Sequence, residues 1–368
     1  MKGLMISSDF RGQILDGGMA INKRNYMILN KCCEELDLFV IKKKNTFYKK
    51  TQLLYEIFTA KNFYGIGLKD IEDIINSIKR NKYDFCFISS SLAGILAYYI
   101  KKNVPQIKVV VFFHNLEYKY FIQMRKIFSY KFPYRYLLGV LAKKNEKLSI
   151  IYADKIISLN KRDAIEIKNL YGRDIDFVLP TTFDDKYKND VNLSCNIKSN
   201  TKKILLFVGS DFYANFHGIN WFIENVLGSL NNIILYVVGK GTETWREKFK
   251  NINNLNIVGS VDDLGKYYAL ADAVVLPIFL GSGMKTKTAE ALMYGKYIFG
   301  TKEAFEGYDI DFGKIGGLCC NKDDFIEKIN NHFKVINNDY NEYSRKIFLE
   351  KYDTKKWIGI MKNFLNEN

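Results

Sequence analysis

Two lysines and a glutamate follow a glycine turn late in the chain, and their spacing suits a phosphorylated sugar. Residues 274–301 read VVLPIFLGSGMKTKTAEALMYGKYIFGT. Lys285 and Lys287 bring positive charge near the expected start of a helix, where unpaired N–H groups and the helix dipole already attract anions. Glu290 follows one and a half turns later, and its carboxylate can accept hydrogen bonds from neighbouring ribose hydroxyls. The pattern predicts phosphate and sugar binding; the alternative is a surface helix with solvated charges.

The elements that must position these residues are predicted from the same stretch. Ala273–Leu276 is short, apolar and closed by Pro277, as a buried parallel strand should be. A turn with two glycines follows, and residues 284–294 are good helix formers that end before Gly295. The order strand, glycine turn, helix and strand predicts a nucleotide-binding unit of an α/β sheet.

The stretch GSGMKTKTAEALMYGK (281–296) resembles the donor-binding motif of retaining glycosyltransferases of the GT-B fold, family 4 and its relatives. The resemblance continues into Gly300-Thr301 and Glu306-Gly307. Family members commonly carry two glutamates eight residues apart; Glu290 stands at the second station and Ser282 at the first. The resemblance implies that the donor is bound by Ser282, Gly283, Met284, Lys285, Lys287, Thr288, Ala289 and Glu290.

A second stretch, FVGSDFYANFHGINWF (207–222), resembles the opening of the same family's donor domain and implies donor contacts from Gly209 and Ser210. The Arg and Lys that many members place here are absent, so we expect Lys285 and Lys287 to neutralise the donor phosphates. Residues 257–264 resemble the segment that lines the base, and this implies a contact from Val261.

In the first half of the chain, two places follow predicted strands, where ligands of open α/β sheets gather. Gly17 and Gly18 lie between a strand at 2–7 and a helix expected from about Met19, and His114 follows an apolar strand at 108–113. The resemblance implies that the glycines face the donor phosphates and that His114 bonds a hydroxyl of the transferred sugar. The alternatives are an ordinary turn and a structural histidine. We assign His114 and Lys285 to the reaction centre.

The net charge of +15 is concentrated in the first half, where residues 1–180 hold 31 Lys and Arg against 17 Asp and Glu. Within it, residues 118–150 interleave basic and aromatic side chains with Glu146 as the only acid. This composition suits an anionic membrane surface; an ordinary helix with core aromatics and a nucleic-acid-binding segment are the alternatives. No nucleic-acid partner is expected.

The length of 368 residues and the repeated strand and helix pattern predict an α/β protein of the GT-B kind, two Rossmann-like doubly wound domains facing across a cleft. We expect an acceptor-binding domain at 1–183, a linker at 184–203, a nucleotide-sugar domain at 204–345, and a final helix at 346–368 that returns to the first domain. No run approaches the roughly 18 apolar residues of a membrane span, so we expect a cytoplasmic protein, either free or peripheral at the inner face of the cell membrane. Scattered cysteines and histidines predict no metal and no cofactor.

The predicted function is retaining transfer of a sugar from a UDP-sugar, or a GDP-sugar, to a glycan or polyprenyl-diphosphate-linked acceptor in surface polysaccharide synthesis. Two other classes remain open. A GT-B nucleotide-sugar epimerase or phosphorylase would use a similar scaffold, and a non-catalytic module that binds membrane or nucleic acid would explain the basic segment and the missing first glutamate.

Overall fold

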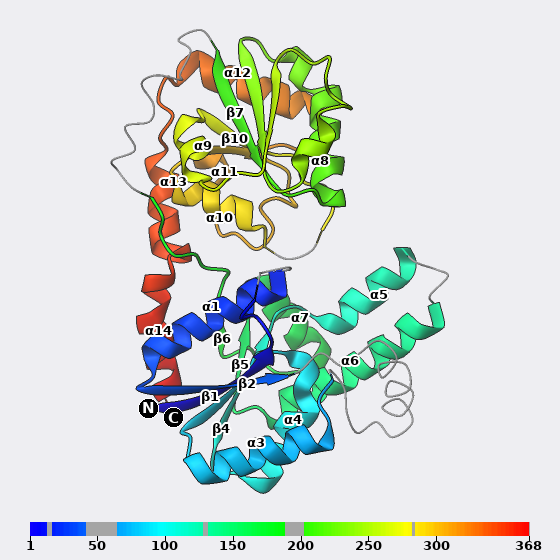
Figure 1. Cartoon of the computed structure of the whole chain (residues 1–368), viewed down its shortest axis with the longest axis vertical. Coiled ribbons are helices and arrows are strands. Elements are labelled where there is room, and N and C mark those ends of the chain that lie inside the picture. The colour runs from blue at the N-terminus through cyan, green and yellow to red at the C-terminus, as the bar shows by residue number, and fades with distance from the viewer. Residues whose placement is uncertain (13–16, 42–64, 128–131, 188–201, 282–283, 368) are drawn as a thin grey trace. The chain divides into compact units, whose positions relative to one another are not determined.

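The computed structural model describes residues 1–12, 17–41, 65–127, 132–187, 202–281 and 284–367 (Figure 1). The chain divides into two compact units, one of Met1–Thr181 with Trp357–Asn368 and one of Thr182–Lys356. Each unit holds a parallel sheet of six strands flanked by helices. The predicted α/β class with two doubly wound sheets is therefore confirmed.

The first sheet has the strand order β2-β1-β3-β4-β5-β6. Its elements are β1 (Lys2–Ser8), α1 (Gly17–Cys32), β2 (Glu35–Ile41), α3 (Leu68–Asn81), β3 (Phe85–Ile88), α4 (Gly94–Asn103), β4 (Lys108–Phe113), α5 (Glu117–Ile127), α6 (Phe132–Tyr152), β5 (Lys155–Ser158), α7 (Lys161–Tyr171), β6 (Phe177–Val178) and α14 (Thr354–Asn366).

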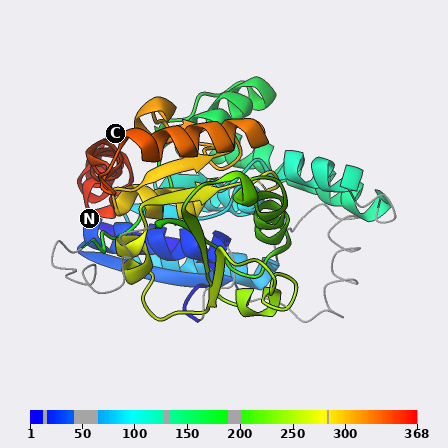
Figure 2. The ribbon, with the colours of Figure 1, turned by 90° about the horizontal axis from the view of Figure 1, so that it is seen from above.

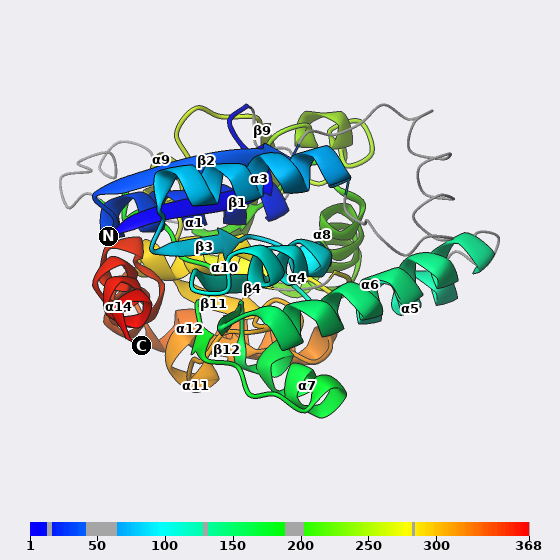
Figure 3. The same cartoon turned by 90° about the horizontal axis from the view of Figure 1, so that it is seen from below.

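Alternate residues of these strands enter two different cores. In β4, Val109 and Val111 pack with α3 and α4, whereas Val110 and Phe112 pack with α1 and α14. A strand buried on both faces reads as a continuous apolar run, which is why 108–113 carries no polar residue after its first lysine. Helices α5 and α6 pack against each other beside this sheet (Figure 3).

The second sheet has the strand order β12-β11-β10-β7-β8-β9. Its elements are β7 (Lys203–Val208), α8 (Tyr213–Asn225), β8 (Ile233–Val238), β9 (Leu255–Gly259), α9 (Gly265–Leu270), β10 (Ala273–Leu276), α10 (Thr286–Met293), β11 (Tyr297–Gly300), α11 (Phe312–Ile315), β12 (Gly316–Leu318), α12 (Lys322–Val335) and α13 (Glu342–Ile347), followed by a π-helical turn at Phe348–Tyr352. Helix α12 packs on β11 and β12 (orange in Figure 2).

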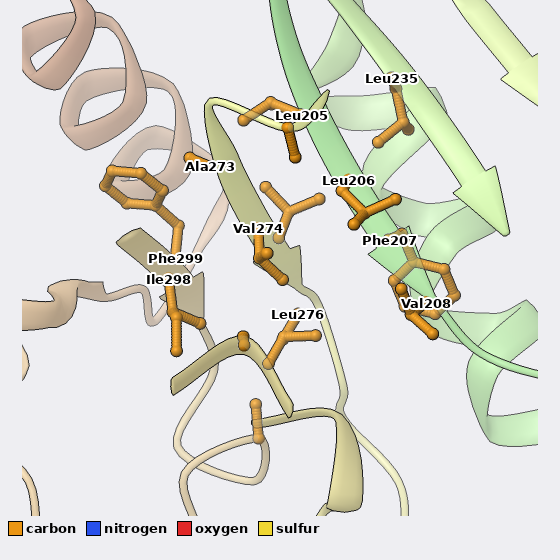
Figure 4. Close-up of a cluster of buried hydrophobic side chains, with 14 of the residues drawn as sticks. Leu205, Leu206, Phe207, Val208, Leu235, Ala273, Val274, Leu276, Ile298 and Phe299 are labelled. Atoms are coloured by element: carbon orange, nitrogen blue, oxygen red, sulfur yellow. The ribbon is translucent and has the colours of Figure 1, made fainter. Parts of the chain in front are cut away.

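Neighbouring strands β7 and β10 form the centre of the second core. Leu205 and Leu206 of β7 pair in register with Ala273 and Val274 of β10 (Figure 4). Their side chains are fully buried together with Phe207 and Leu276. This packing fixes where the two strands end, and so fixes the loops that follow them.

The segment expected as a linker lies mostly at 188–201, outside the described residues. Its first residues lie in the second unit, where both Arg345 guanidinium amino groups donate to the Asp185 carboxylate, at 2.9 and 2.5 Å. The Arg345 guanidinium also lies 4.7 Å from the Tyr187 ring. Residues 183–187 are therefore held against α10 and α13 rather than extended into solvent.

Candidate functional site

The second sheet changes its direction of growth between β7 and β10. From β7 the order runs outward through β8 and β9, and from β10 it runs the other way through β11 and β12. At such a point the loops after the two central strands diverge and leave room for a ligand. These loops are residues 209–212, after β7, and residues 277–285, after β10, of which 282 and 283 lie outside the described residues.

Lys287, in the first turn of α10, connects the two loops. Its ammonium donates a hydrogen bond to Asn215 Oδ1, and Asn215 Nδ2 donates to the Ser210 carbonyl at 3.0 Å. The ammonium also lies 5.3 Å from the Phe207 ring, and burial lowers the pKa of Lys287 to about 8. Among the described residues, no carboxylate forms an ion pair with Lys287. A partly buried cation that forms no ion pair with a described carboxylate, and that Glu290 attracts only from beyond ion-pair distance, therefore stands at the point where a ligand is expected.

Lys285 is paired, which the sequence did not predict. Its ammonium lies 2.6 Å from Glu303 Oε1, and its carbonyl accepts a hydrogen bond from the Tyr308 hydroxyl at 2.5 Å. We expected an anionic ligand to offset both lysines, but Glu303 already offsets Lys285. Glu303 follows β11, so the rule that polar groups gather at carboxyl ends of strands is the one signal that could have identified it.

Glu290 is partly buried on α10 and has one described hydrogen bond. The Tyr268 hydroxyl donates to Glu290 Oε2 at 3.3 Å, and the Tyr268 ring stacks on Tyr294 with ring centroids 4.6 Å apart. Burial raises the pKa of Glu290, although the Tyr268 hydrogen bond and nearby lysines oppose this. Within the described part of the chain nothing donates to Oε1, so the carboxylate keeps acceptor capacity for ligand hydroxyls.

Three other predicted donor-site residues face the protein interior. Thr288 is fully buried and its hydroxyl donates to the Ala304 carbonyl at 2.7 Å. Ala289 and Met284 belong to the hydrophobic core of the second sheet. Their side chains hold α10 against the sheet, so only their backbone groups can meet a ligand. Ser282 and Gly283 lie outside the described residues.

The loop after β7 is shaped by close backbone packing. A Cβ on Gly209 would come within 3.0 Å of the Asn215 side chain, and one on Gly239 would come within 2.1 Å of the Gly209 carbonyl oxygen. Ser210 is exposed at the turn, and Val261 packs partly buried against the core. The structure therefore places Gly209 and Ser210 beside Lys287, through Asn215, and gives Val261 a packing contact.

In the first unit, a set of hydrogen bonds connects the ends of three strands. His114 Nε2 lies 3.3 Å from Ser89 Oγ, and Ser89 Oγ donates to Asn22 Oδ1 at 2.7 Å. Asn22 Nδ2 donates to Ser8 Oγ at 2.9 Å. Ser8 ends β1, Ser89 follows β3 and His114 follows β4, and the order of this sheet reverses between β1 and β3. The structure thus places His114 at the carboxyl edge of this sheet and adds Asn22 and Ser89, which the sequence did not single out.

Gly17 and Gly18 are the first residues of α1, not part of the loop before it as expected. Glycine is tolerated in the first turn of a helix, where the backbone N–H groups have no intrahelical partner. The loop residues 13–16 lie outside the described residues.

Within the described residues, no group of three or more His, Cys, Asp or Glu side chains is arranged to hold a metal ion. The helices among them include none that combines the length and apolar character needed to span a bilayer.

Three comparisons with known proteins bear on this arrangement. The family described as Glycosyl transferases group 1 matches residues 202–334. The comparison with curated proteins gave no match. Among solved structures, a sucrose-phosphate synthase from Thermosynechococcus elongatus is similar with a TM-score of 0.70 at 13% identity, over 99% of this chain and 98% of that chain.

Two further structures are similar along their whole length. HepE of Anabaena, in complex with UDP, has a TM-score of 0.70 at 13% identity over 99% of both chains. WaaG, a glycosyltransferase involved in lipopolysaccharide biosynthesis, has a TM-score of 0.65 at 16% identity over 100% of both chains.

Two parallel sheets with these strand orders and these structural neighbours define a protein of the GT-B fold. The region that carries Lys287 and Glu290 belongs to the glycosyl transferases group 1 family, so the resemblance read from the sequence is confirmed.

Proposed function

We propose that the chain is a retaining glycosyltransferase that uses a nucleoside-diphosphate sugar, with a UDP-sugar favoured over a GDP-sugar. The observation that carries the proposal is Lys287, a partly buried cation at the switch point of the second sheet that forms no ion pair among the described residues. A diphosphate beside it would supply the missing negative charge. The UDP held by HepE, a structural neighbour, is the reason to favour uridine.

The other residues of the site take roles that follow from their contacts. Glu290 accepts hydrogen bonds from the ribose through the carboxylate oxygen that Tyr268 leaves available. The ion pair with Glu303 holds Lys285 beside Gly281, where its ammonium can donate to a donor phosphate although its charge is already offset. As the acceptor oxygen bonds to the sugar carbon, the bond from that carbon to phosphate breaks, and the acceptor proton passes to a phosphate oxygen of the departing nucleotide. Lys287 stabilises the charge that develops on that diphosphate.

The first unit supplies the acceptor side of the reaction in this proposal. Tyr118 and Phe121 pack with Leu141 and Ala142, so part of the basic and aromatic segment is a core between α5 and α6. Other apolar side chains of α6 are exposed, namely Tyr136, Leu137, Val140 and Ile151. Exposed apolar groups next to lysines favour contact with an anionic membrane and an acceptor carried there on a polyprenyl diphosphate, as in surface polysaccharide synthesis.

Nucleotide binding and donor turnover test the proposal directly. The thermal midpoint of the protein should rise with UDP more than with GDP or ADP, because a ligand that binds only the folded state stabilises it. Slow release of UDP from one UDP-sugar should accompany this. Absence of both effects for every nucleotide and donor would support a non-catalytic module instead.

The membrane part has its own test. The protein should sediment with vesicles of anionic phospholipid and remain in solution with vesicles of neutral phospholipid. Tyr136→Ser with Val140→Ser should weaken this binding and leave the UDP response unchanged. Equal binding to both kinds of vesicle, or none, would contradict the membrane assignment without affecting the donor site.

A further inference from the structure

Arg24 of α1 is a buried cation in the first unit with unused hydrogen-bond donors. The side chain is 7% exposed, and Nη1 donates to the Pro180 carbonyl at 2.5 Å. Nε and Nη2 are buried and make no hydrogen bond to any of the described residues. No carboxylate of the described residues forms an ion pair with the guanidinium.

Such an arrangement is costly for the folded chain. Burial of a charged group without a partner is strongly unfavourable, and burial lowers the pKa of Arg24 to about 9. The ring of Phe112, 5.6 Å from the guanidinium carbon, offers only a weak attraction. The stability of the first unit alone does not explain why an arginine occupies this position.

The two unused nitrogens are the pair best arranged to hold an oxyanion. Nε and Nη2 lie on one edge of the planar guanidinium, and their N–H bonds run parallel to each other. Two oxygens of one carboxylate or phosphate group match that spacing and accept both hydrogen bonds. The Pro180 carbonyl occupies Nη1 and leaves this edge for a ligand.

The place in the fold is also one where ligands bind. Pro180 follows β6, and the Phe112 ring near Arg24 contacts the His114 ring, with centroids 5.1 Å apart. The next residue of α1, Asn25, donates to Ser89 Oγ at 3.2 Å, but its buried Oδ1 has no partner within the described part of the chain. Three of the five buried side-chain atoms without partners among the described residues thus belong to Arg24 and Asn25. They lie at the carboxyl edge of the sheet, beside the residue assigned to the reaction centre.

We propose that Arg24 binds an oxyanion through Nε and Nη2, and that this anion is a phosphate or carboxylate group of the acceptor. The oxyanion site stands on the contacts of Arg24, whereas its attribution to the acceptor rests on the proposed glycosyl transfer. Because both nitrogens are buried in this structure, the anion can reach them only if the surrounding groups move.

Thermal denaturation with simple anions tests the site. The full chain is prepared with Lys287→Met to weaken phosphate binding at the donor site, and is then compared with the same protein carrying Arg24→Met or Arg24→Lys. Inorganic phosphate and glucuronate are the two probes, at constant ionic strength. We expect at least one of them to raise the thermal midpoint of the Arg24 protein, and the responding anion identifies phosphate or carboxylate as the preferred group.

The two substitutions separate the effect of the paired guanidinium donors from the effect of the positive charge. Arg24→Met should abolish the response. Arg24→Lys keeps the positive charge but loses the two parallel N–H donors, so it should weaken the apparent affinity for the responding anion at least tenfold. Without anion, Arg24→Met should melt at the same temperature as its parent or higher. An equal response in Arg24→Met, or no response of the Arg24 protein to either anion, would overturn the proposal.

UDP binding in otherwise unmodified protein distinguishes this site from the donor site. Arg24→Met and Arg24→Lys should keep the UDP response of the unmodified chain, which also shows that they fold. If UDP binds none of these proteins while phosphate or glucuronate still acts through Arg24, the donor proposal fails and the oxyanion site stands. If UDP binds all of them and neither anion raises the thermal midpoint, the donor proposal stands and the oxyanion site fails.

Discussion

The Lys287 ammonium donates to Asn215 Oδ1, and this hydrogen bond joins the helix after β10 to the helix after β7. Because β7 and β10 are the two strands at which the second sheet reverses its order, the bond spans the expected ligand position. The same hydrogen bond holds Lys287 in place before a ligand binds, so binding of a diphosphate costs little additional side-chain entropy.

Replacement of Lys287 by methionine should weaken UDP binding by tenfold or more, because one charge-assisted hydrogen bond to the diphosphate is lost, on the order of 1.4 kcal/mol or more. Isothermal titration with UDP measures this. Lys334→Met, which removes an exposed lysine of α12 in the same unit, is the matched control and should bind UDP normally. Equal affinity of the two variants would remove Lys287 from the donor site.

The affinity for UDP should fall as pH rises above about 8. Burial lowers the pKa of Lys287 to about 8, so the side chain is charged below that pH and neutral above it. A bound diphosphate favours the charged form, and binding therefore takes up a proton above pH 8, with a loss approaching tenfold per pH unit. Lys287→Met should show a flatter profile, and an unchanged slope in that variant would assign the pH dependence to another group.

Glu290→Gln should separate ribose recognition from phosphate recognition. The substitution keeps the shape of the side chain but removes the negative charge and one of its two acceptor oxygens. UDP should bind about tenfold more weakly, whereas inorganic pyrophosphate, which has no ribose, should bind as before. Glu224→Gln, at an exposed position of α8, provides the control. An equal loss for both ligands would indicate that Glu290 acts on the phosphates or on the fold.

Thr288→Val should lower stability without changing nucleotide affinity. Valine fills the same space but cannot donate to the buried Ala304 carbonyl, which should cost about 1–3 kcal/mol in the free energy of unfolding. Thr286→Val, at the exposed first residue of the same helix, should change stability little. Urea denaturation measures both. If folded Thr288→Val loses UDP affinity, Thr288 contacts the donor after all, as the sequence resemblance implied.

Glu146→Gln should stabilise the protein at pH 8 and leave it nearly unchanged at pH 4.5. Glu146 is fully buried, accepts hydrogen bonds from the Glu117 backbone N–H and the Tyr171 hydroxyl, at 2.7 and 2.6 Å, and has its pKa raised to about 7 by burial. The folded state therefore holds a proton that the unfolded state releases between pH 4.5 and 7, and stability falls as pH rises through that range.

Glutamine resembles the protonated carboxyl group, so the variant should avoid this loss, on the order of 3 kcal/mol. The measurement is the free energy of unfolding at a series of pH values, with Glu72→Gln on the exposed face of α3 as control. A variant as pH-sensitive as the unmodified chain would assign the pH dependence to another group, such as Glu117, whose pKa burial also raises to about 7.

The sequence predicted the α/β fold and the helix that carries Lys285, Lys287 and Glu290, because glycine turns, apolar strands and helix periodicity are local signals. The partners of these residues could not be read in the same way. Asn215 lies 72 residues from Lys287, Tyr268 22 residues from Glu290, and Glu303 18 residues from Lys285. Only the strand order brings them together, and a single sequence does not specify that order.

Thr288 shows a different limit. A family resemblance assigns a residue to a position of a motif, but it does not show whether that residue faces the ligand or the core. Thr288 and Ala289 lie on the face that also buries Leu292, and the Thr288 hydroxyl serves the Ala304 carbonyl. The buried polar residues of α1, namely Asn22, Arg24 and Asn25, escaped notice because their meaning depends on strand ends from distant parts of the chain.

Helix α14 packs Met361, Phe364 and Leu365 into the core formed by α1 and one face of the first sheet. Lys108 and Lys155 donate to the Leu365 and Phe364 carbonyls, at 3.0 and 2.8 Å. On the ribosome these residues emerge only after all of the second unit has been translated. The apolar side chains of α1 and of the first sheet that α14 covers therefore stay exposed during synthesis until this helix leaves the exit tunnel, and the first unit is more prone to aggregation until then.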